Sequence, residues 1–461
     1  MFESTFYATR QPLLPLNKLF KFYDIVKYHK NQYVLDYLIN EFTSNHQLEE
    51  ALYLASDVLY NELIKYKTMP LSFSDKEKNR ILHSLTKYYI RASARATPFG
   101  LFGNFREGSF DIIEDNNASN KLEYHSKLDM EVLYQISEYI LNIDGIKNYL
   151  ILSHNTSLYK TKDDFRYVEY RMRKGLRSHH LVSIKCDSLI NFIIKTSKKG
   201  IGYDALILEL LNNYDVNQKD IEGYVDDLIS CKLLITNLDI NITGKDYFEI
   251  LSDFISKISS SVINDKISIV KNILHDINSL LLQINYQQSN ITSYKRIHEL
   301  VKQLLPNIPE KNLIQLDVTS KKKDYTLPPE SLSHLNSLLH IFSAFSKSYS
   351  TENFQLEIFK RAFYERYENR TMKLTEVLDE ELGIGYKSAI SIKDIYNSRN
   401  TDKNKFTRFV LKKYHQYLKQ KERYIEINDI EINEYFGNIT DTQTMNPGFT
   451  YLLNVYPKKV G

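Results

Sequence analysis

The first hundred residues have the apolar spacing of amphipathic helices. From about residue 17 to 100 the pattern is helical, most clearly in KEKNRILHSLTKYYIRASA, where apolar residues recur every three or four positions. Ser74 followed by Glu77 predicts a capping box, because each side chain can bond a backbone amide of the other residue. Pro98 cannot continue the helical hydrogen-bond ladder. The pattern therefore predicts a helix whose last turn contains RASARA.

The pattern changes between residues 157 and 240. SLYKTKDDFRYVEYRM and SHHLVSIKCD are rich in β-formers with turn residues between them, which indicates a small sheet. YDALILELLNNYD and QKDIEGYVDDLISCKLL then have helical periodicity around a short polar turn, and LLITNL is extended and apolar. Helix, turn, helix and strand in this order predict a winged helix-turn-helix.

The remainder mixes helices with short strands. YFEILSDFISKISSSV, SYKRIHELVKQLL, SLSHLNSLLHIFSAFSKSY and FQLEIFKRAFYERY predict helices, while LLNVY alternates like a strand. NLIQLDVT is a β-rich run in which we expect the strand to end at Asp317. The predicted fold class is α+β, with several subdomains, many helices, small mixed sheets and the embedded winged helix-turn-helix. We place soft domain boundaries at residues 1–150, 155–240 and 245–461.

Composition narrows the class of protein. The chain has 461 residues, 43% hydrophobic and 25% charged, as expected for a soluble globular protein. A formal charge of only +3 means that a nucleic-acid partner must be bound by a local patch. The two cysteines, Cys186 and Cys231, cannot form a disulfide framework, so we expect a reduced, cytoplasmic setting. No secretion signal and no run of 18 apolar residues is present in the sequence, so we expect no membrane span.

Arg91 and Arg95 are four residues apart and are expected on one shoulder of the apolar stripe of their helix. Two guanidinium groups at the edge of a core need an anionic partner, because unpaired charges there are costly. A phosphate or carboxylate ligand fits, since the planar guanidinium binds both with two parallel hydrogen bonds. An internal salt bridge near the helix end is the alternative, and spacing alone favours it.

Three further residues are ambiguous by themselves. Asp129 precedes a predicted helix, so its default role is an N-cap. Asp317 could equally be a functional carboxylate or the cap of a turn. Arg10 could equally be a functional residue or an ordinary surface arginine. The sequence contains no Gly-rich phosphate loop, HExxH or G-x-S-x-G motif. His179 and His180 have no third ligand at a convincing spacing, so we expect no metal site.

Several motifs resemble one family in the same order along the chain. RASARATPFGLFGNF is similar to the signature of the N-terminal region of the lantibiotic dehydratases. ATRQPLLPL, KLDMEVL and NLIQLDV resemble the family's Arg-x-Pro-Leu-Leu-Pro, Leu-Asp and Gln-x-Asp segments, and FKRAFYERYENRTMKLTEVLDEELGIGY resembles a further block. In that block the usual Val-Pro-Leu is Met372-Lys373-Leu374, so we expect the local turn to differ.

The resemblance implies transfer of glutamate from glutamyl-tRNA to Ser and Thr hydroxyls of a precursor peptide, with glutamyl-tRNA as co-substrate and no cofactor. By motif match it implies a catalytic set of Arg10, Arg91, Arg95, Asp129 and Asp317. It also places a leader-peptide recognition element at residues 155–240, where the leader is expected to add a strand to the small sheet. The second predicted helix there carries four acidic residues, which disfavours DNA as a partner.

The chain stops at LLNVYPKKVG, whereas the resemblance implies more of the glutamylation region and then an elimination domain. A split system, a truncated reading frame and a fragment are all compatible with this, and we expect a second polypeptide to complete the enzyme. Two functions of different class remain: a component of a glutamyl-tRNA-dependent dehydratase, or a catalytically silent module that binds the leader peptide. The complete motif set favours the first, because leader binding alone does not need it.

Overall fold

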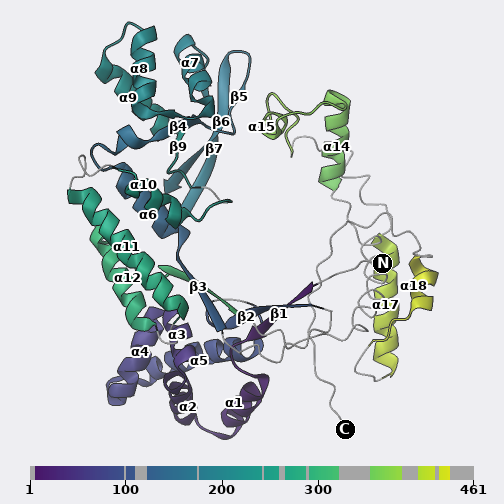
Figure 1. The fold of residues 1–461 in the computed structure, drawn as a ribbon. Coiled ribbons are helices and arrows are strands. Elements are labelled where there is room, and N and C mark those ends of the chain that lie inside the picture. The colour runs from purple at the N-terminus through teal and green to yellow at the C-terminus, as the bar shows by residue number, and fades with distance from the viewer. Residues whose placement is uncertain are drawn as a thin grey trace. The chain divides into compact units, whose positions relative to one another are not determined.

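The chain forms two compact units, one of residues 4–326 and one made mainly of residues 327–461. The computed structural model describes residues 6–97, 100–109, 122–173, 176–240, 243–258, 265–286, 290–320, 354–386, 403–420 and 425–436. Helices predominate among them, together with three small sheets (Figure 1). The predicted α+β class is confirmed.

The N-terminal helices pack around a long helix, α5. They are α1 (Leu16–Tyr28), α2 (Asn31–Ser44), α3 (His46–Ala55), α4 (Asp57–Thr68), the short 3-10 helix η1 (Pro70–Ser72) and α5 (Asp75–Ala94). The Tyr89 ring of α5 is fully buried and packs against Phe22 and Phe42. The capping box is confirmed, since the Ser74 amide donates to the Glu77 carboxylate at 2.8 Å and the Glu77 amide donates to Ser74 Oγ at 3.4 Å. Pro98 lies outside the described residues.

A four-stranded sheet joins distant parts of the sequence. Its strands are β1 (Phe6–Pro12), β2 (Gly103–Ser109), β10 (Ile314–Ser320) and β3 (Leu122–Leu128), in that spatial order. β2 and β10 are parallel, and the other pairs are antiparallel. One face is apolar: Tyr124, Leu316 and Val318 are buried on it. The sequence analysis predicted only β10 among these strands, because the pairing partners lie far apart along the chain.

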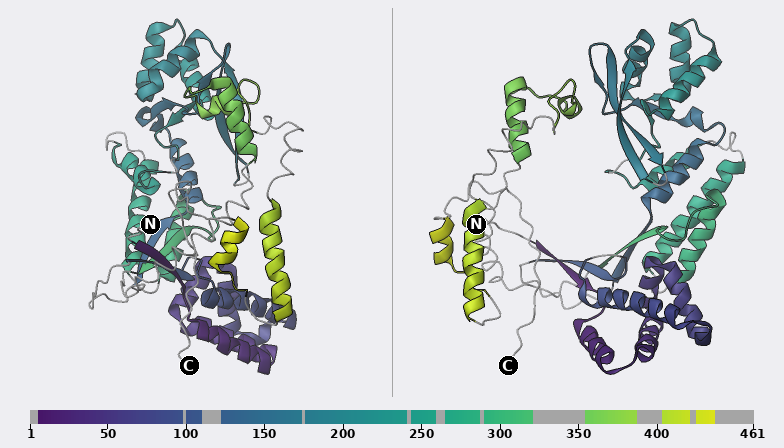
Figure 2. Two further views of the ribbon diagram at one scale, coloured as in Figure 1. Left: turned by 90° about the vertical axis from the view of Figure 1, so that its right-hand side faces the viewer. Right: turned by 180° about the vertical axis from the view of Figure 1, so that it is seen from behind.

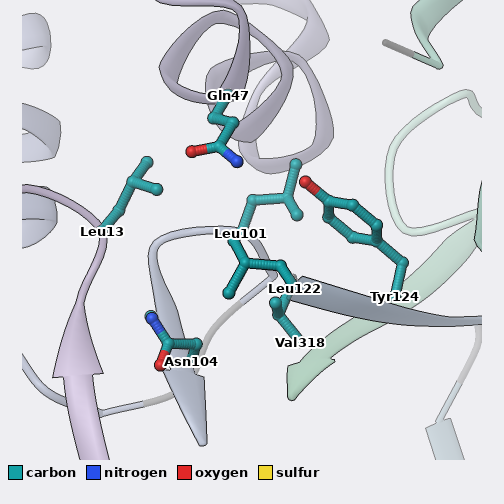
Figure 3. A pocket seen from close by; sticks show the side chains of 8 residues that line it. Leu13, Gln47, Leu101, Asn104, Leu122, Tyr124 and Val318 are labelled. Atoms are coloured by element: carbon teal, nitrogen blue, oxygen red, sulfur yellow. The ribbon is translucent and has the colours of Figure 1, made fainter. Parts of the chain in front are cut away.

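A small cavity lies between the buried face of this sheet and α3. Figure 3 shows the amide of Asn104 pointing from β2 and that of Gln47 from α3 toward a space lined otherwise by apolar side chains and Tyr124. Its volume is about 10 Å³, which is room for one water molecule. The cavity is therefore too small to accept an amino acid or a nucleotide.

The predicted small sheet and the paired helices are present in the middle of the chain. The elements are α6 (Met130–Leu141), η2 (Ile146–Tyr149), β4 (Ile151–His154), β5 (Tyr159–Lys160), β6 (Asp164–Arg173), β7 (Leu176–Lys185), α7 (Ser188–Thr196), η3 (Ser197–Lys199), β8 (Ile201–Gly202), α8 (Tyr203–Asn213), α9 (Gln218–Ser230) and β9 (Leu234–Thr236). The sheets have the orders β5-β6-β7 and β8-β4-β9. Helix, turn, helix and strand follow one another as predicted, and the winged-helix assignment stays a prediction.

Three helices complete the unit of residues 4–326: α10 (Tyr247–Ser256), α11 (Asp265–Tyr286) and α12 (Ile291–Leu304). α11 and α12 lie side by side in every view (Figure 2). α11 supports the four-stranded sheet, because the Ser126 hydroxyl of β3 donates to the Leu281 carbonyl at 3.0 Å. No helix among the described residues is long and apolar enough to cross a membrane.

A buried carboxyl ties α3 to α12. Glu50 is 1% exposed, and its Oε1 accepts hydrogen bonds from the Tyr294 hydroxyl at 2.6 Å and from Asn290 Nδ2 at 3.3 Å. Burial raises the pKa of Glu50 above its usual 4.5, although these hydrogen bonds oppose the change. The folded protein therefore keeps this proton in a pH range where the unfolded chain has lost it.

We expect Glu50 to lower the stability as the pH rises. Its contribution is fully present below pH 4.5 and is lost as the pH rises through the folded-state pKa. Glu50→Gln does not titrate, so the difference in free energy of unfolding, variant minus parent, should increase as the pH rises from 4.5 to 7. Urea unfolding at several pH values measures this. Glu49→Gln on the same helix is the control, and parallel pH profiles for parent and Glu50→Gln would contradict the expectation.

The unit of residues 327–461 contains α14 (Phe354–Tyr367), α15 (Leu374–Leu378), α17 (Lys403–Gln420) and α18 (Asp429–Phe436). Gly383 packs so closely on the carbonyls of residues 376 and 377 that any Cβ would clash. Lys373 stands where the resembling motif has proline. Its φ is −68°, which is the value that a proline ring imposes, so the backbone angle is the one a proline would have. The predicted helix at 331–349 and strand at 452–456 lie outside the described residues.

Candidate functional site

The arginine pair lies at the C-terminal end of α5. Arg91 is in the last helical turn and half-buried, whereas Arg95 is the C-cap, exposed, with extended backbone at φ −102° and ψ 111°. We expected both arginines to lie within the helix, and the structure confirms this for Arg91, whereas Arg95 is the residue that follows the last helical position. Burial, and after it the charge of Arg95, lower the pKa of Arg91. Two cations are thus held close enough to repel one another, at a helix end whose carbonyls favour positive charge.

The predicted internal salt bridge is not found for Arg95. Within the part of the chain that the structure describes, no carboxylate forms an ion pair with it. The end of α5 is fixed to the sheet by its neighbours: the Leu14 amide, just after β1, donates to the Ala92 carbonyl at 2.8 Å. The Tyr88 ring stacks on Phe102, just before β2, with centroids 5.4 Å apart. The end of α5 that carries both arginines is therefore next to the ends of two strands.

Arg10 and Asp317 lie on the same face of the four-stranded sheet. Arg10 of β1 pairs with Phe105 of β2, and Phe105 pairs with Thr319 of β10, so these side chains share a face with Asp317 two residues away. Arg10 and Asp317 are exposed, and Phe105 is 37% exposed, so this is the open face. Strand spacing puts the Cα atoms of Arg10 and Asp317 roughly 12 Å apart, near enough for both side chains to contact one ligand. The predicted strand end at Asp317 is wrong, because β10 continues to Ser320.

Asp129 has the N-cap role that its position predicts. Its carboxylate accepts a hydrogen bond from the Glu131 amide at 2.9 Å at the start of α6, and its own amide donates to the Leu313 carbonyl at 2.9 Å. It follows directly after β3, four residues beyond His125, which pairs with Asp317. The same strand dimensions place it roughly 14 Å from Asp317. Asp129 is thus at the end of the sheet where β1 ends and β2 begins, outside the immediate neighbourhood of Arg10.

The sheet adds polar residues that the sequence analysis did not single out. His125 Nε2 and Thr319 Oγ1 are 2.8 Å apart, and Gln315 Nε2 donates to Asp317 Oδ2 at 3.4 Å. All four alternate along β3 and β10 on the open face. The alternation of polar and apolar residues in NLIQLDVT was a sequence signal for Gln315 and Thr319. His125 is identified only by the pairing of β10 with β3. Within the described residues, no three His, Cys, Asp or Glu side chains are grouped to hold a metal ion.

The open face thus has an arginine at one side and a carboxylate near its centre, and the end of α5 that carries two further arginines lies beyond the ends of β1 and β2. Such a set can bind anionic groups by paired hydrogen bonds and orient a hydroxyl or an amine with the carboxylate.

The family model described as "Lantibiotic dehydratase, N terminus" matches residues 44–458. The chain belongs to this family.

Individual proteins and solved structures are also similar to the chain. Subtilin biosynthesis protein SpaB of Bacillus subtilis is 26% identical over 365 residues, which are 77% of this chain and 34% of SpaB. The crystal structure of MibB, a tRNA-dependent lantibiotic dehydratase from Microbispora sp. 107891, matches 94% of this chain and 40% of its own with a TM-score of 0.68 at 17% identity. The glutamylation domain of TbtB from thiomuracin biosynthesis matches 74% of this chain with a TM-score of 0.51 at 14% identity. The chain spans about a third of the length of SpaB.

Proposed function

We propose that this chain performs the glutamyl-transfer half of a lantibiotic dehydratase, moving glutamate from glutamyl-tRNA to Ser and Thr hydroxyls of a leader-bearing precursor peptide. The observation that carries the proposal is the common open face of Arg10 and Asp317, next to the α5 end with Arg91 and Arg95. The family membership and the likeness to a glutamylation domain support it.

The reaction needs little covalent chemistry from the protein. The peptide hydroxyl oxygen attacks the glutamyl carbonyl, a new ester bond forms, and the bond to the 3′-terminal ribose oxygen breaks. The hydroxyl proton ends on the departing ribose oxygen. Because the aminoacyl ester is already activated, rate enhancement comes from positioning the hydroxyl and from stabilising the tetrahedral oxyanion.

We assign the roles from the geometry of each residue. Arg91 and Arg95 hold the 3′-terminal phosphate or the glutamyl carboxylate, because they are two adjacent cations at one helix end. Arg10 binds the other anionic group from across the sheet. Asp317 orients the glutamyl amino group from the open face. Asp129 acts indirectly, by fixing the start of α6 beside the sheet.

The test is glutamyl transfer in a defined mixture. The chain is incubated with glutamyl-tRNA and a leader-bearing precursor peptide, alone and together with a polypeptide corresponding to the rest of a full-length relative. We expect glutamyl adducts on the precursor by mass spectrometry, and we propose that the second polypeptide is required for full rate. If no adduct forms in either mixture while the chain still binds the leader, it is a leader-binding module. Since glutamyl-tRNA is the co-substrate, we place the reaction in the cytoplasm.

We propose β7 as the strand to which the leader peptide adds. β7 is at the end of the order β5-β6-β7, so one of its edges is open among the described strands. Leu181 on it is 51% exposed, which offers apolar surface to an added strand. This binding mode joins backbone hydrogen bonds for affinity with side-chain contacts for register.

Placing a charge on this edge should weaken leader binding. For Leu181→Asp we expect the dissociation constant of the leader peptide to rise by about tenfold or more, since burying an unpaired carboxylate under the added strand is costly. Fluorescence anisotropy with a labelled leader peptide measures it. Leu208→Asp is the matched control, because Leu208 is 60% exposed on α8, away from the sheet. Equal affinities for the two variants would remove β7 as the docking edge.

A further inference from the structure

His125 lies directly across from Asp317 on the open face of the four-stranded sheet. The two residues are register partners in the antiparallel pair of β3 and β10. Side chains opposite one another in such a pair share a face and have their Cβ atoms roughly 5 Å apart. Both residues are exposed. An imidazole and a carboxylate are therefore neighbours on the surface to which we assign glutamyl transfer.

The imidazole of His125 is held by one hydrogen bond. Its Nε2 is 2.8 Å from Thr319 Oγ1, and among the described residues the ring forms no other hydrogen bond. When Nε2 carries the proton and donates to the Thr319 hydroxyl, Nδ1 is the nitrogen that has a lone pair to offer. The ring then has a fixed orientation and one nitrogen ready to accept a proton from a substrate.

Few charged groups surround this ring. Glu123 and Lys127 are two residues away on β3 and share its face, and Asp317 faces it from β10. The helix α11 packs on the opposite face of β3. β3 is at the end of the order β1-β2-β10-β3, so no further described strand lies beyond it. Of these side-chain types, only histidine ordinarily changes its charge between roughly pH 5 and pH 8.

The role assigned to Asp317 brings the reacting carbonyl close to His125. Asp317 orients the glutamyl amino group, and such a hydrogen bond spans about 3 Å. The amino nitrogen and the carbonyl carbon of an amino acid are two bonds apart, which is about 2.5 Å. The carbonyl carbon therefore lies within roughly 6 Å of the Asp317 carboxylate, a separation similar to that of Asp317 and His125. A hydroxyl that approaches this carbon from the side of β3 contacts the imidazole.

We propose that His125 is the general base of the transfer reaction and that Thr319 positions its ring. Nδ1 of His125 takes the proton of the Ser or Thr hydroxyl while the hydroxyl oxygen bonds to the glutamyl carbonyl carbon. When the bond from this carbon to the ribose oxygen breaks, the imidazolium gives the same proton to the ribose oxygen. The proton that leaves the peptide is thus the one that the tRNA receives, and the ring ends neutral. This role rests on the proposed function for the identity of the reaction.

The first test compares the transfer rates of the parent and His125→Gln from about pH 5.5 to about pH 8.5. Glutamine keeps an amide N–H for Thr319 but has no basic nitrogen. At the upper end of the range we expect the variant to be slower by on the order of 100-fold. The ratio of the two rates should shrink several-fold toward the lower end, where the imidazole of the parent is protonated. The amino group of glutamyl-tRNA titrates in both reactions, so its effect cancels from the ratio.

The second test detects bound substrate next to the ring without any transfer. Diethyl pyrocarbonate adds to neutral imidazoles, and peptide mapping by mass spectrometry measures its addition to each histidine. A glutamyl-tRNA in which an amide replaces the ester should slow the modification of His125 several-fold. The modification of His83, which is exposed on α5, should not change.

Variants of Thr319 test the positioning role. Thr319→Val removes the hydroxyl and should slow transfer by about 3- to 10-fold, whereas Thr319→Ser keeps the hydroxyl and should restore most of the rate. Both variants should keep the pH dependence of the parent, because the base is still present. His83→Gln is the control for the loss of a histidine and should match the parent at every pH. The unfolding midpoint of each variant shows that it is folded.

The outcomes separate the role of His125 from the proposed function. A ratio of parent to His125→Gln rates that does not vary with pH would mean that the ring only supports the sheet, and would overturn the role. Modification of His125 that the amide analogue does not slow would also overturn it. Transfer by His125→Gln at the parent's rate would refute the base and leave the proposed function standing. Absence of transfer by the parent in every mixture would overturn both.

Discussion

Replacing Arg91 by alanine is expected to reduce glutamyl transfer to the precursor peptide by on the order of 100-fold or more. Arg91 is half-buried in the last turn of α5, where burial and the charge of Arg95 already lower its pKa. An anionic substrate group bound there relieves the repulsion between the two guanidiniums, so the interaction is worth more than at an exposed site. The rate of adduct formation by mass spectrometry, at saturating glutamyl-tRNA, measures the effect.

The control is Arg80→Ala, which removes an arginine from the same helix. Arg80 pairs with Glu62 at the surface, and such pairs contribute little. Its transfer rate should stay within about twofold of the parent. Arg91→Lys keeps the charge but loses the planar guanidinium group and its paired hydrogen bonds, so its transfer rate should lie between those of the parent and Arg91→Ala. Circular dichroism and the unfolding midpoint show whether each variant is folded, and a folded Arg91→Ala chain with the parent's rate would refute the assignment.

The second large effect concerns stability. Phe102→Ala is expected to lower the free energy of unfolding by about 3–5 kcal/mol. Phe102 is 1% exposed, its ring stacks on Tyr88 of α5, and its carbonyl accepts a hydrogen bond from the Leu13 amide at 3.0 Å. Truncation leaves a cavity where α5, β1 and β2 meet. Urea unfolding followed by near-ultraviolet circular dichroism measures the loss.

Phe20→Ala is the matched substitution at the surface. Phe20 is 60% exposed on α1, so the same change of side chain should alter the free energy of unfolding by less than about 1 kcal/mol. Equal losses for the two variants would mean that Phe102 does not connect α5 to the sheet. Because Phe102 stacks on Tyr88, three residues before Arg91 on α5, we also expect Phe102→Ala to transfer glutamate more slowly at temperatures where it is still folded.

Helices were predictable where local signals agreed. The capping box of Ser74 and Glu77 and the apolar periodicity after it located α5 closely, and the same periodicity located α8 and α9. These signals involve residues within a few turns of one another, so no tertiary information is needed. Asp129 as an N-cap is a further local prediction that the structure confirms.

The sheet was not predictable in the same way. β1, β2 and β3 have weak patterns of their own, and they become strands by pairing with partners that are distant in sequence. This is also why Asp317 was misplaced at a strand end. Its run looked short, and the continuation to Ser320 depends on the pairing with β3 and β2.

By itself the sequence determined helices such as α5, α8 and α9, the small sheet of the middle segment and the set of motif residues that carries the resemblance to the lantibiotic dehydratases. The tertiary structure decided which of these residues share a surface. Arg10 and Asp317 have no local relationship, and only the order β1-β2-β10-β3 puts them on one open face. Helix periodicity is a property of neighbouring residues, whereas a binding surface depends on long-range pairing that no short window of sequence contains.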